Sequence, residues 1–278
     1  MRRMRQIKDR WTEEDVRYLS QFGIKAKVGF MYFNIEEDDH YFEILKHFEE
    51  RWKPLLWSHD SFHYGYSKEE MEASEYFVIK GSHCCGYPQP DWNFKYESVS
   101  FDAEKICPGC GCGRVQTNDL RVNKVSKYGF WTFFSWLIDE FFVSEKVYSE
   151  VFAPYGIEKR DVIMAGKKLE DVFQLIIPVI DESIDLSNRK KEICTVCGET
   201  KYTMQHFAYP FFPLHNHPLP GIYKTKEYFG SGHEAQHVLI ISKDIVNKLM
   251  KSKDLKKEWL IPCRSDYKDF ITQNKHSL

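Results

Sequence analysis

Two short stretches, Cys107-Pro-Gly-Cys110-Gly111 and Cys194-Thr-Val-Cys197-Gly198, share the pattern Cys-x-x-Cys-Gly and decide how this chain folds. In each of these knuckles, two intervening residues let a tight turn aim both sulfurs at one point, and the following glycine suits the positive φ of such a turn. Four thiolates that arrive as two close pairs are the ligand set of a closed, structural zinc site. The sequence therefore predicts one structural Zn²⁺ with four ligands: Cys107, Cys110, Cys194 and Cys197.

The predicted site is structural rather than catalytic, because four cysteine ligands leave no open coordination position. Redox chemistry is the alternative, but a thioredoxin-like site uses a single Cys-x-x-Cys pair at a helix N-terminus. Cys112 lies beside the first knuckle, and we expect it to be a free thiol rather than a substitute ligand. His83-Cys84-Cys85 could form half of another metal site, but no partner pair lies nearby and turn residues in a packed loop explain it better.

The composition bears on partners and compartment. Lys and Arg total 39 against 41 for Asp and Glu, which gives a net charge of −2 and does not favour nucleic acid or an anionic membrane as partner. The charged N-terminus has no apolar export segment, and no apolar run reaches transmembrane length. Eight cysteines in such a chain fit a reducing compartment. We expect a soluble cytoplasmic protein.

Residues 1–100 predict an N-terminal α+β region. Thr12-Glu-Glu-Asp15 and Ser67-Lys-Glu-Glu70 are capping boxes, each of which begins a helix. Residue type and periodicity predict three further elements: a strand within Lys25–Ile35, a helix over Asp39–Trp52 and a strand at Tyr76–Ile79. A turn-rich stretch follows, so we place a domain boundary at about residue 100, with residues 101–278 as the second region.

Two stretches of the second region share one chemical pattern. Phe141–Phe152 (FFVSEKVYSEVF) and Leu239–Met250 (LIISKDIVNKLM) both run through three apolar residues, a serine, two charged residues and then apolar and polar pairs. Each predicts a strand that ends at a serine N-cap and an amphipathic helix that begins there. Each follows a knuckle and precedes an apolar stretch that ends in proline, Pro178 or Pro262. The sequence thus predicts an α+β fold in which two pseudo-repeated strand–Ser–helix units are joined by a tetracysteine, zinc-ribbon-like site; a coincidence of two strand–turn–helix stretches is the alternative.

With these features located, the second region resembles the double-CXXCG family of bacterial proteins, known from paralogues in myxobacteria, which includes immunity proteins of toxin–immunity systems. The likeness covers roughly residues 65–263 and is carried by these segments: Tyr66–Phe77, Ile106–Gly111, Val143–Glu145, Ile193–Gly198, Ile241-Ser242 and Trp259–Pro262. The chain departs from the pattern at Cys112 and at Lys243, which stands where an acidic residue follows the serine. The resemblance implies a protein that neutralises a partner toxin, encoded nearby, by occluding it, and it supplies no catalytic residues.

One stretch, His233-Glu-Ala-Gln-His237, matches the H-E-x-x-H pattern of zinc metallopeptidases. In such enzymes two histidines on one helix face hold the metal and the glutamate activates water, and here Glu258 could supply a third ligand. That chemistry requires a helix, whereas glycines precede the stretch and the β-branched run Val238–Ile241 follows it. A metallopeptidase therefore stands as the alternative to a binding protein without enzymatic activity.

The stretch His206–Gly221 (HFAYPFFPLHNHPLPG) mixes prolines and glycine with aromatic residues and histidines, which argues against regular structure. Aromatic side chains anchor protein interfaces at a low cost in entropy, so we expect this loop to contribute to the surface that contacts a toxin. A zinc-ribbon module that contacts nucleic acid is a third possibility, which the neutral charge balance does not favour.

Overall fold

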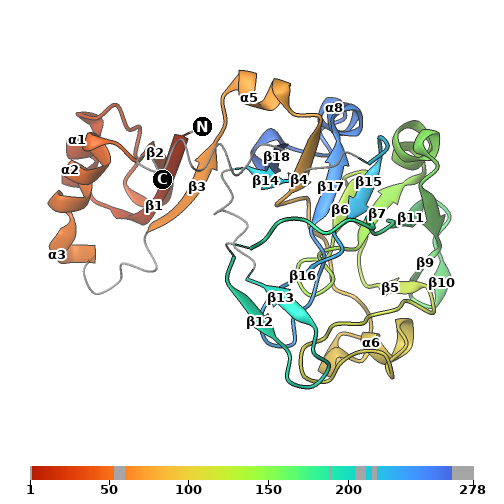
Figure 1. Ribbon diagram of the computed structural model, residues 1–278. Coiled ribbons are helices and arrows are strands. Elements are labelled where there is room, and N and C mark those ends of the chain that lie inside the picture. The colour runs from red at the N-terminus through yellow and green to blue at the C-terminus, as the bar shows by residue number, and fades with distance from the viewer. Residues whose placement is uncertain (1, 53–59, 188, 204–210, 215–217, 265–278) are drawn as a thin grey trace. The chain divides into compact units, whose positions relative to one another are not determined.

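The computed structural model describes residues 2–52, 60–187, 189–203, 211–214 and 218–264, and these form a mixed α+β fold (Figure 1). The chain divides into two compact units, a first unit up to Ala73 and a second unit that begins at Ser74. The boundary expected near residue 100 is therefore wrong. Strand β4 (Tyr76–Ile79) pairs with β17 (Leu239–Ser242) and β18 (Leu260–Arg264), so it belongs to the second unit. Local sequence gives no signal of such distant pairing.

The first unit is a three-stranded antiparallel sheet in the order β2-β1-β3, with helices on one of its faces (Figure 1). Its strands are β1 (Arg2–Trp11), β2 (Gly29–Glu36) and β3 (Asp60–Gly65), and its helices are α1 (Glu13–Ser20), α2 (Asp39–His47), α3 (Glu49–Trp52) and α5 (Lys68–Ala73). Both predicted capping boxes form: Thr12 and Asp15 exchange backbone-to-side-chain hydrogen bonds, and so do Ser67 and Glu70. Each box supplies acceptors to backbone N–H groups that a helix start otherwise leaves unpaired.

The core of the first unit lies between the inner face of its sheet and the helices. Ile7, Trp11 and Phe33 of the sheet are buried against the following helix residues: Leu19, Tyr41, Ile44, Phe48 and Trp52. Asp9 is anchored on this inner side, because its carboxylate accepts a hydrogen bond from the Trp52 ring nitrogen at 2.7 Å and pairs with Arg51 at 3.0 Å. Five of these eight core residues are aromatic, and aromatic side chains bury large apolar areas.

The described residues of the second unit form four sheets. A five-stranded sheet has the order β14-β18-β4-β17-β15, a four-stranded sheet the order β6-β7-β11-β8, and two three-stranded sheets the orders β10-β9-β5 and β12-β13-β16. The remaining strands are β5 (Leu120–Val122), β6 (Phe130–Thr132), β7 (Phe141–Ser144), β8 (Glu158–Arg160), β9 (Val162–Met164), β10 (Lys167–Lys168), β11 (Val172–Ile176), β12 (Lys191–Ile193), β13 (Thr200–Tyr202), β14 (Phe212–Pro213), β15 (Ile222–Lys224) and β16 (Tyr228–Phe229). The helical segments are η1 (Trp92–Phe94), α6 (Tyr96–Ser100), α7 (Glu145–Val147), η2 (Tyr148–Phe152), η3 (Ala153–Tyr155), α8 (Lys243–Lys251) and η4 (Lys257–Trp259).

Both strand–Ser–helix stretches have the predicted local structure. Strand β7 ends at Ser144 and strand β17 ends at Ser242, and in each case a helix begins at the next residue. The two serines have nearly the same extended backbone, with φ/ψ of −70/154 and −73/151. Their side chains differ in role, because the Ser144 hydroxyl caps its helix while the Ser242 hydroxyl accepts a hydrogen bond from the backbone N–H of Gly221. Whether the two stretches form a repeat stays a prediction.

The two proline-terminated stretches occupy different positions in their sheets. Strand β11, which ends just before Pro178, pairs directly with β7, the strand of the preceding strand–Ser–helix stretch. Strand β18, which contains Pro262, pairs with β4, and β4 separates it from β17. The two stretches therefore differ in sheet position, because β4, from the start of the second unit, lies between β17 and β18.

Part of the predicted contact loop is buried. Residues 206–210 and 215–217 lie outside the described residues, while Phe211, Phe212 and Leu214 are buried and β14 pairs with β18. Residues 211–214 therefore belong to the core rather than to a contact surface. Leu219, in contrast, is 81% exposed. None of the described helices combines the length and the apolar composition that crossing a bilayer requires.

Candidate metal centre

The two knuckles have the same backbone geometry. In the first, the N–H of Gly111 donates to the carbonyl of Cys107 at 2.8 Å; in the second, the N–H of Gly198 donates to the carbonyl of Cys194 at 2.9 Å. Both glycines have a positive φ, +75° and +77°, as predicted from their place in the pattern. The second knuckle is the tip of the β12–β13 hairpin, and the first follows α6 in a loop. Each turn presents its two sulfurs on one side.

The structure brings all four predicted cysteines together. The Cys107 and Cys194 sulfurs lie 3.8 Å apart and the Cys110 and Cys197 sulfurs 3.5 Å apart, and all four lie within 4.8 Å of one another. They are free thiols, since a disulfide would place two sulfurs about 2.05 Å apart. The sequence identified this group completely.

The geometry fits a tetrahedral metal ion. With a metal–sulfur distance of about 2.3 Å, the edges of a tetrahedron of four sulfurs measure about 3.8 Å. The sulfur–sulfur separations of 3.5 and 3.8 Å lie close to that value, so little movement of the knuckles would be needed. The four cysteines could therefore hold one metal ion, whose chemistry there would be structural because they fill its coordination positions.

The two knuckles differ in exposure. Cys107 and Cys110 are buried, whereas Cys194 is half-buried and Cys197 is exposed. Backbone N–H groups of Cys197 and Val196 are directed at the Cys194 sulfur and lower the pKa of that thiol to about 6, while burial raises the pKa of Cys110 to about 12. A thiolate at Cys194 is a metal ligand that is ready at neutral pH.

Glycines of the first knuckle allow other segments to approach closely. A side-chain carbon at Gly109 would lie 2.8 Å from Val196 and 3.3 Å from the Cys194 sulfur. A side-chain carbon at Gly111 would lie only 2.0 Å from the backbone oxygen of His233. The knuckle is therefore packed between the second knuckle and the segment around residue 233, where a larger residue would not fit.

Lys201 is a residue of this centre that the sequence did not reveal. It lies on β13, just after the second knuckle, and is 3% exposed. Its ammonium group donates to three backbone carbonyls: Cys110 at 3.2 Å, Gly232 at 2.5 Å and Glu234 at 3.0 Å. A buried cation beside four thiols also lowers the electrostatic cost of thiolates at the site. A lysine in a charged stretch after a knuckle gives no sequence signal that distinguishes it from a surface residue.

The other cysteines named from the sequence lie outside the four-sulfur group. Cys112 is buried beside the first knuckle and is not part of the group, as expected for a free thiol. Cys84 and Cys85 form no ligand group with His83 among the described residues. The His83 ring stacks on Tyr128 with centroids 3.3 Å apart, which supports a packing role for this turn.

The H-E-x-x-H stretch is not helical. Glu234 closes a turn by donating its N–H to Ser231, and Gln236 forms a β-bridge with Phe229. His233 lies 3.8 Å from Glu97, while His237 contacts the carbonyl of Glu227 through Nδ1 at 3.3 Å. Neither histidine belongs to a ligand group in the described part of the chain. The geometry thus gives no support to the metallopeptidase alternative.

A polar cavity of about 220 Å³ shares segments with the metal centre. Arg114, just after the first knuckle, lies 3.6 Å from Asp139, and the N–H of His237 donates to the other Asp139 oxygen at 3.0 Å. Lys224 pairs with Glu140 at 2.5 Å and lies 3.9 Å from Asp139. Asp139 is 3% exposed, so this network places a charged cluster inside the unit.

Scans of protein-family models, of curated proteins and of solved structures each find no match to this chain. The resemblance to the double-CXXCG family therefore rests on the sequence segments that carry it. The described residues define the kind of site: a closed group of four thiols where the two knuckles meet.

Proposed function

We propose that this chain is an immunity-type protein that neutralises a partner bacterial toxin by binding and occluding it, and that one zinc ion stabilises its second unit. The observation that carries the proposal is the convergence of the two knuckles on one four-sulfur group. The order of knuckles and serine-capped helices along the chain supports it, because this order resembles the double-CXXCG family.

Zinc is the proposed metal because soft thiolate ligands in tetrahedral geometry suit it, with iron as the competing ion. Zinc binding to such a site contributes on the order of 10 kcal/mol to folding. That amount is comparable to the whole stability of a domain, which is about 5–15 kcal/mol. The metal would thus decide whether the segments around the knuckles fold.

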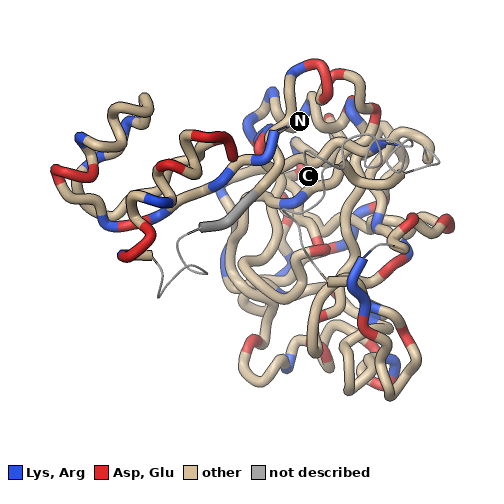
Figure 2. Tube along the Cα trace, turned by 60° about the vertical axis from the view of Figure 1, so that its left-hand side comes forward, with Lys and Arg blue, Asp and Glu red and all other residues tan. Residues whose placement is uncertain are grey.

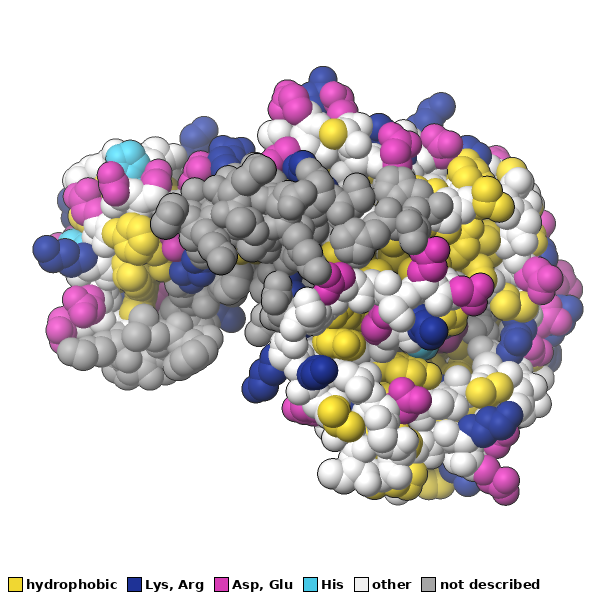
Figure 3. All heavy atoms as spheres, in the orientation of Figure 1, with side chains coloured by type: hydrophobic (Ala, Val, Ile, Leu, Met, Phe, Trp, Pro, Cys, Tyr) yellow, Lys and Arg dark blue, Asp and Glu magenta, His cyan; other side chains and the backbone are white. Residues whose placement is uncertain are grey.

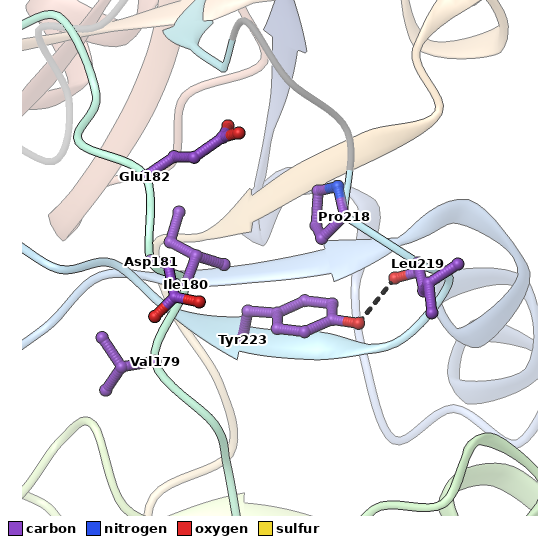
Figure 4. Close-up of a pocket in the computed structure, with 7 residues that line it drawn as sticks. All are labelled: Val179, Ile180, Asp181, Glu182, Pro218, Leu219 and Tyr223. Atoms are coloured by element: carbon purple, nitrogen blue, oxygen red, sulfur yellow. Dashed lines mark hydrogen bonds between the residues drawn. The ribbon is translucent and has the colours of Figure 1, made fainter.

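A hollow of about 340 Å³ in the second unit offers a contact surface for the toxin. Figure 4 shows that its lining comes from two facing segments, 179–182 and 218–219, with the Tyr223 ring between them. The Tyr223 hydroxyl donates to the carbonyl of Leu219 at 2.8 Å, which fixes the ring. Hydrophobic side chains also reach the surface beside acidic ones elsewhere on this unit (Figure 3).

The chemistry of this hollow suits a long cationic side chain. Val179 and Leu219 are 48% and 81% exposed and would contact the apolar stem of a lysine or arginine. Asp181 and Glu182 lie at the same hollow and would attract its charged end. The proposal therefore includes a basic toxin that places a Lys or Arg side chain here.

The test is co-expression of the chain with the toxin encoded by the adjacent gene, followed by affinity purification and a growth assay. The proposal predicts a stable complex and protected cells. It also predicts that Leu219→Asp weakens the complex, whereas the same change at Phe134, an exposed aromatic residue outside the hollow, does not. A chain that neither binds the neighbouring gene product nor protects cells from it contradicts the proposal.

A further inference from the structure

The sheet of the first unit has an outer face of distinct composition. In the antiparallel pair β1–β2, Lys8 lies opposite Tyr32 and Arg10 lies opposite Phe30. Directly opposed residues in such a pair share one side of the sheet, so these four side chains lie on the same face. Phe33, the next residue on β2, is buried on the other side. We call the four residues Lys8, Arg10, Phe30 and Tyr32 the aromatic–basic face.

The rings of this face are open to solvent. Phe30 is 74% exposed and Tyr32 is 59% exposed, and Lys8 and Arg10 are exposed beside them. A single exposed apolar side chain is ordinary on a protein surface. Two aromatic rings at successive outward positions of β2, each with a cation directly across on β1, form a row of rings beside a row of cations.

Cations without a neighbouring carboxylate flank the two rings along part of this face. The six outward positions from Gln6 to Arg10 and from Phe30 to Asn34 contain no carboxylate. Further along the same face, Glu36 pairs with Arg2 at 3.3 Å, while Asp9 points inward and pairs with Arg51. Acidic and basic positions are interspersed along the chain (Figure 2), so the near-neutral net charge does not reveal this local excess of cations beside the rings.

We propose that the aromatic–basic face binds single-stranded nucleic acid. Exposed aromatic rings on a sheet stack with unpaired bases, and Lys and Arg beside them contact the phosphates. Outward positions on one strand are about 6.6 Å apart, which leaves room for a base on each ring. The sheet setting favours a nucleic acid over a protein partner, because rings and cations side by side on one sheet face are the arrangement that binds unpaired bases and their phosphates. The inference is independent of the proposed immunity function.

The test measures binding of fluorescein-labelled dT and U 20-mers to the full chain by fluorescence anisotropy, from low to high salt. The expected result is binding that weakens with salt and is much weaker for a duplex, whose bases are already stacked. Phe30→Ala with Tyr32→Ala lowers the affinity about thirtyfold or more, because two stacking contacts are lost. Lys8→Glu with Arg10→Glu also lowers it and reduces the salt dependence. Comparison of the dT and U oligomers distinguishes DNA from RNA as the source of the strand.

The matched control is Phe42→Ala with Lys46→Glu. Phe42 is 53% exposed and Lys46 is exposed, but both lie on α2, away from the outer sheet face. Unchanged affinity in this variant supports the inference. No binding by the wild-type chain at low salt overturns it, and so does an equal loss in the control variant. Loss of toxin binding by the Phe30/Tyr32 variant, without any oligonucleotide binding by the wild type, would show a protein-docking face instead.

Discussion

The ammonium group of Lys201 donates a hydrogen bond to the backbone carbonyl of Cys110 at 3.2 Å. Lys201 follows the second knuckle and Cys110 belongs to the first, so this contact joins the two knuckles through protein atoms alone. The same ammonium reaches the carbonyls of Gly232 and Glu234, which fixes the segment that packs on Gly111. Protein contacts thus hold the knuckles near each other independently of any metal ion that they could share.

Lys201→Met should destabilise the second unit and loosen its metal. The substitution keeps most of the apolar stem but leaves three backbone carbonyls, of which that of Cys110 is buried, without their donor. Hydrogen bonds to a charged group contribute about 1.5–3 kcal/mol each, so we expect a loss of at least about 3 kcal/mol in the free energy of unfolding. Urea unfolding and the rate of metal loss to a chelator measure both effects. Lys191→Met, on the exposed strand β12, is the control and should change neither.

Gly111→Ala and Gly198→Ala form a matched pair. Both positions have a positive φ that costs about 1–2 kcal/mol for an alanine. At Gly198 nothing lies within 4 Å of the added carbon, so that cost is the whole expected effect. At Gly111 the carbon would also overlap the His233 carbonyl, and the knuckle would have to shift. We expect Gly111→Ala to lose more stability and metal affinity than Gly198→Ala; equal losses by thermal unfolding would contradict the described packing.

Asp139 should make the stability of the second unit depend on pH under acidic conditions. Burial opposes ionisation of this carboxyl, but Lys224 and Arg114 outweigh it and hold its pKa below the ordinary value of 3.8. A carboxyl whose pKa is lower in the folded state stabilises the fold above the unfolded value, and this contribution is lost as the pH falls through the folded pKa. Wild-type stability should therefore drop from about pH 4 downwards.

The variant Asp139→Asn isolates this contribution. Removing one partner of a buried ion pair costs about 3–5 kcal/mol, so the variant should be less stable at pH 7 and should lose less on acidification. Asp161→Asn is the control, because its ion pair with Lys168 is partly exposed and such pairs contribute about 0–1 kcal/mol. Urea unfolding between pH 3 and 7 provides the data. Parallel pH curves for wild type and Asp139→Asn would contradict the described network.

Cys112→Ser should keep the metal. Its sulfur is buried beside the site but lies outside the four-sulfur group, so the substitution removes no ligand. We expect full metal content with a modest loss of stability, because a buried thiol is replaced by a more polar hydroxyl. Cys110→Ser, two residues earlier, should lose the metal. Metal content after gel filtration distinguishes the two variants, and loss from the Cys112 variant would mean that ligands exchange.

Local signals predicted local structure well in this chain. The knuckle glycines, the two capping boxes and the strand Tyr76–Ile79 follow from residue type and short-range spacing, and the structure contains all of them. The four cysteines of the candidate metal centre were found in the same way, because a Cys-x-x-Cys pair is a local pattern that has few other uses.

Features that depend on distant contacts were missed. Strand β4 has the composition of any buried strand, and its place between β17 and β18 is set by pairing across the whole second unit. Lys201 and Asp139 look like surface residues in the sequence, since buried charges are recognised only by the partners that surround them. The aromatic–basic face required the strand register, which shows that Lys8 and Tyr32 lie opposite each other.

The central claim is that Cys107, Cys110, Cys194 and Cys197 together hold one structural zinc ion. The most direct measurement is metal content per chain by inductively coupled plasma mass spectrometry, for the wild type, Cys194→Ser and His233→Ala. We expect one zinc ion per chain in the wild type and in His233→Ala, and no zinc in Cys194→Ser. A wild-type chain without bound metal, or a zinc ion that survives Cys194→Ser and is lost in His233→Ala, would contradict it.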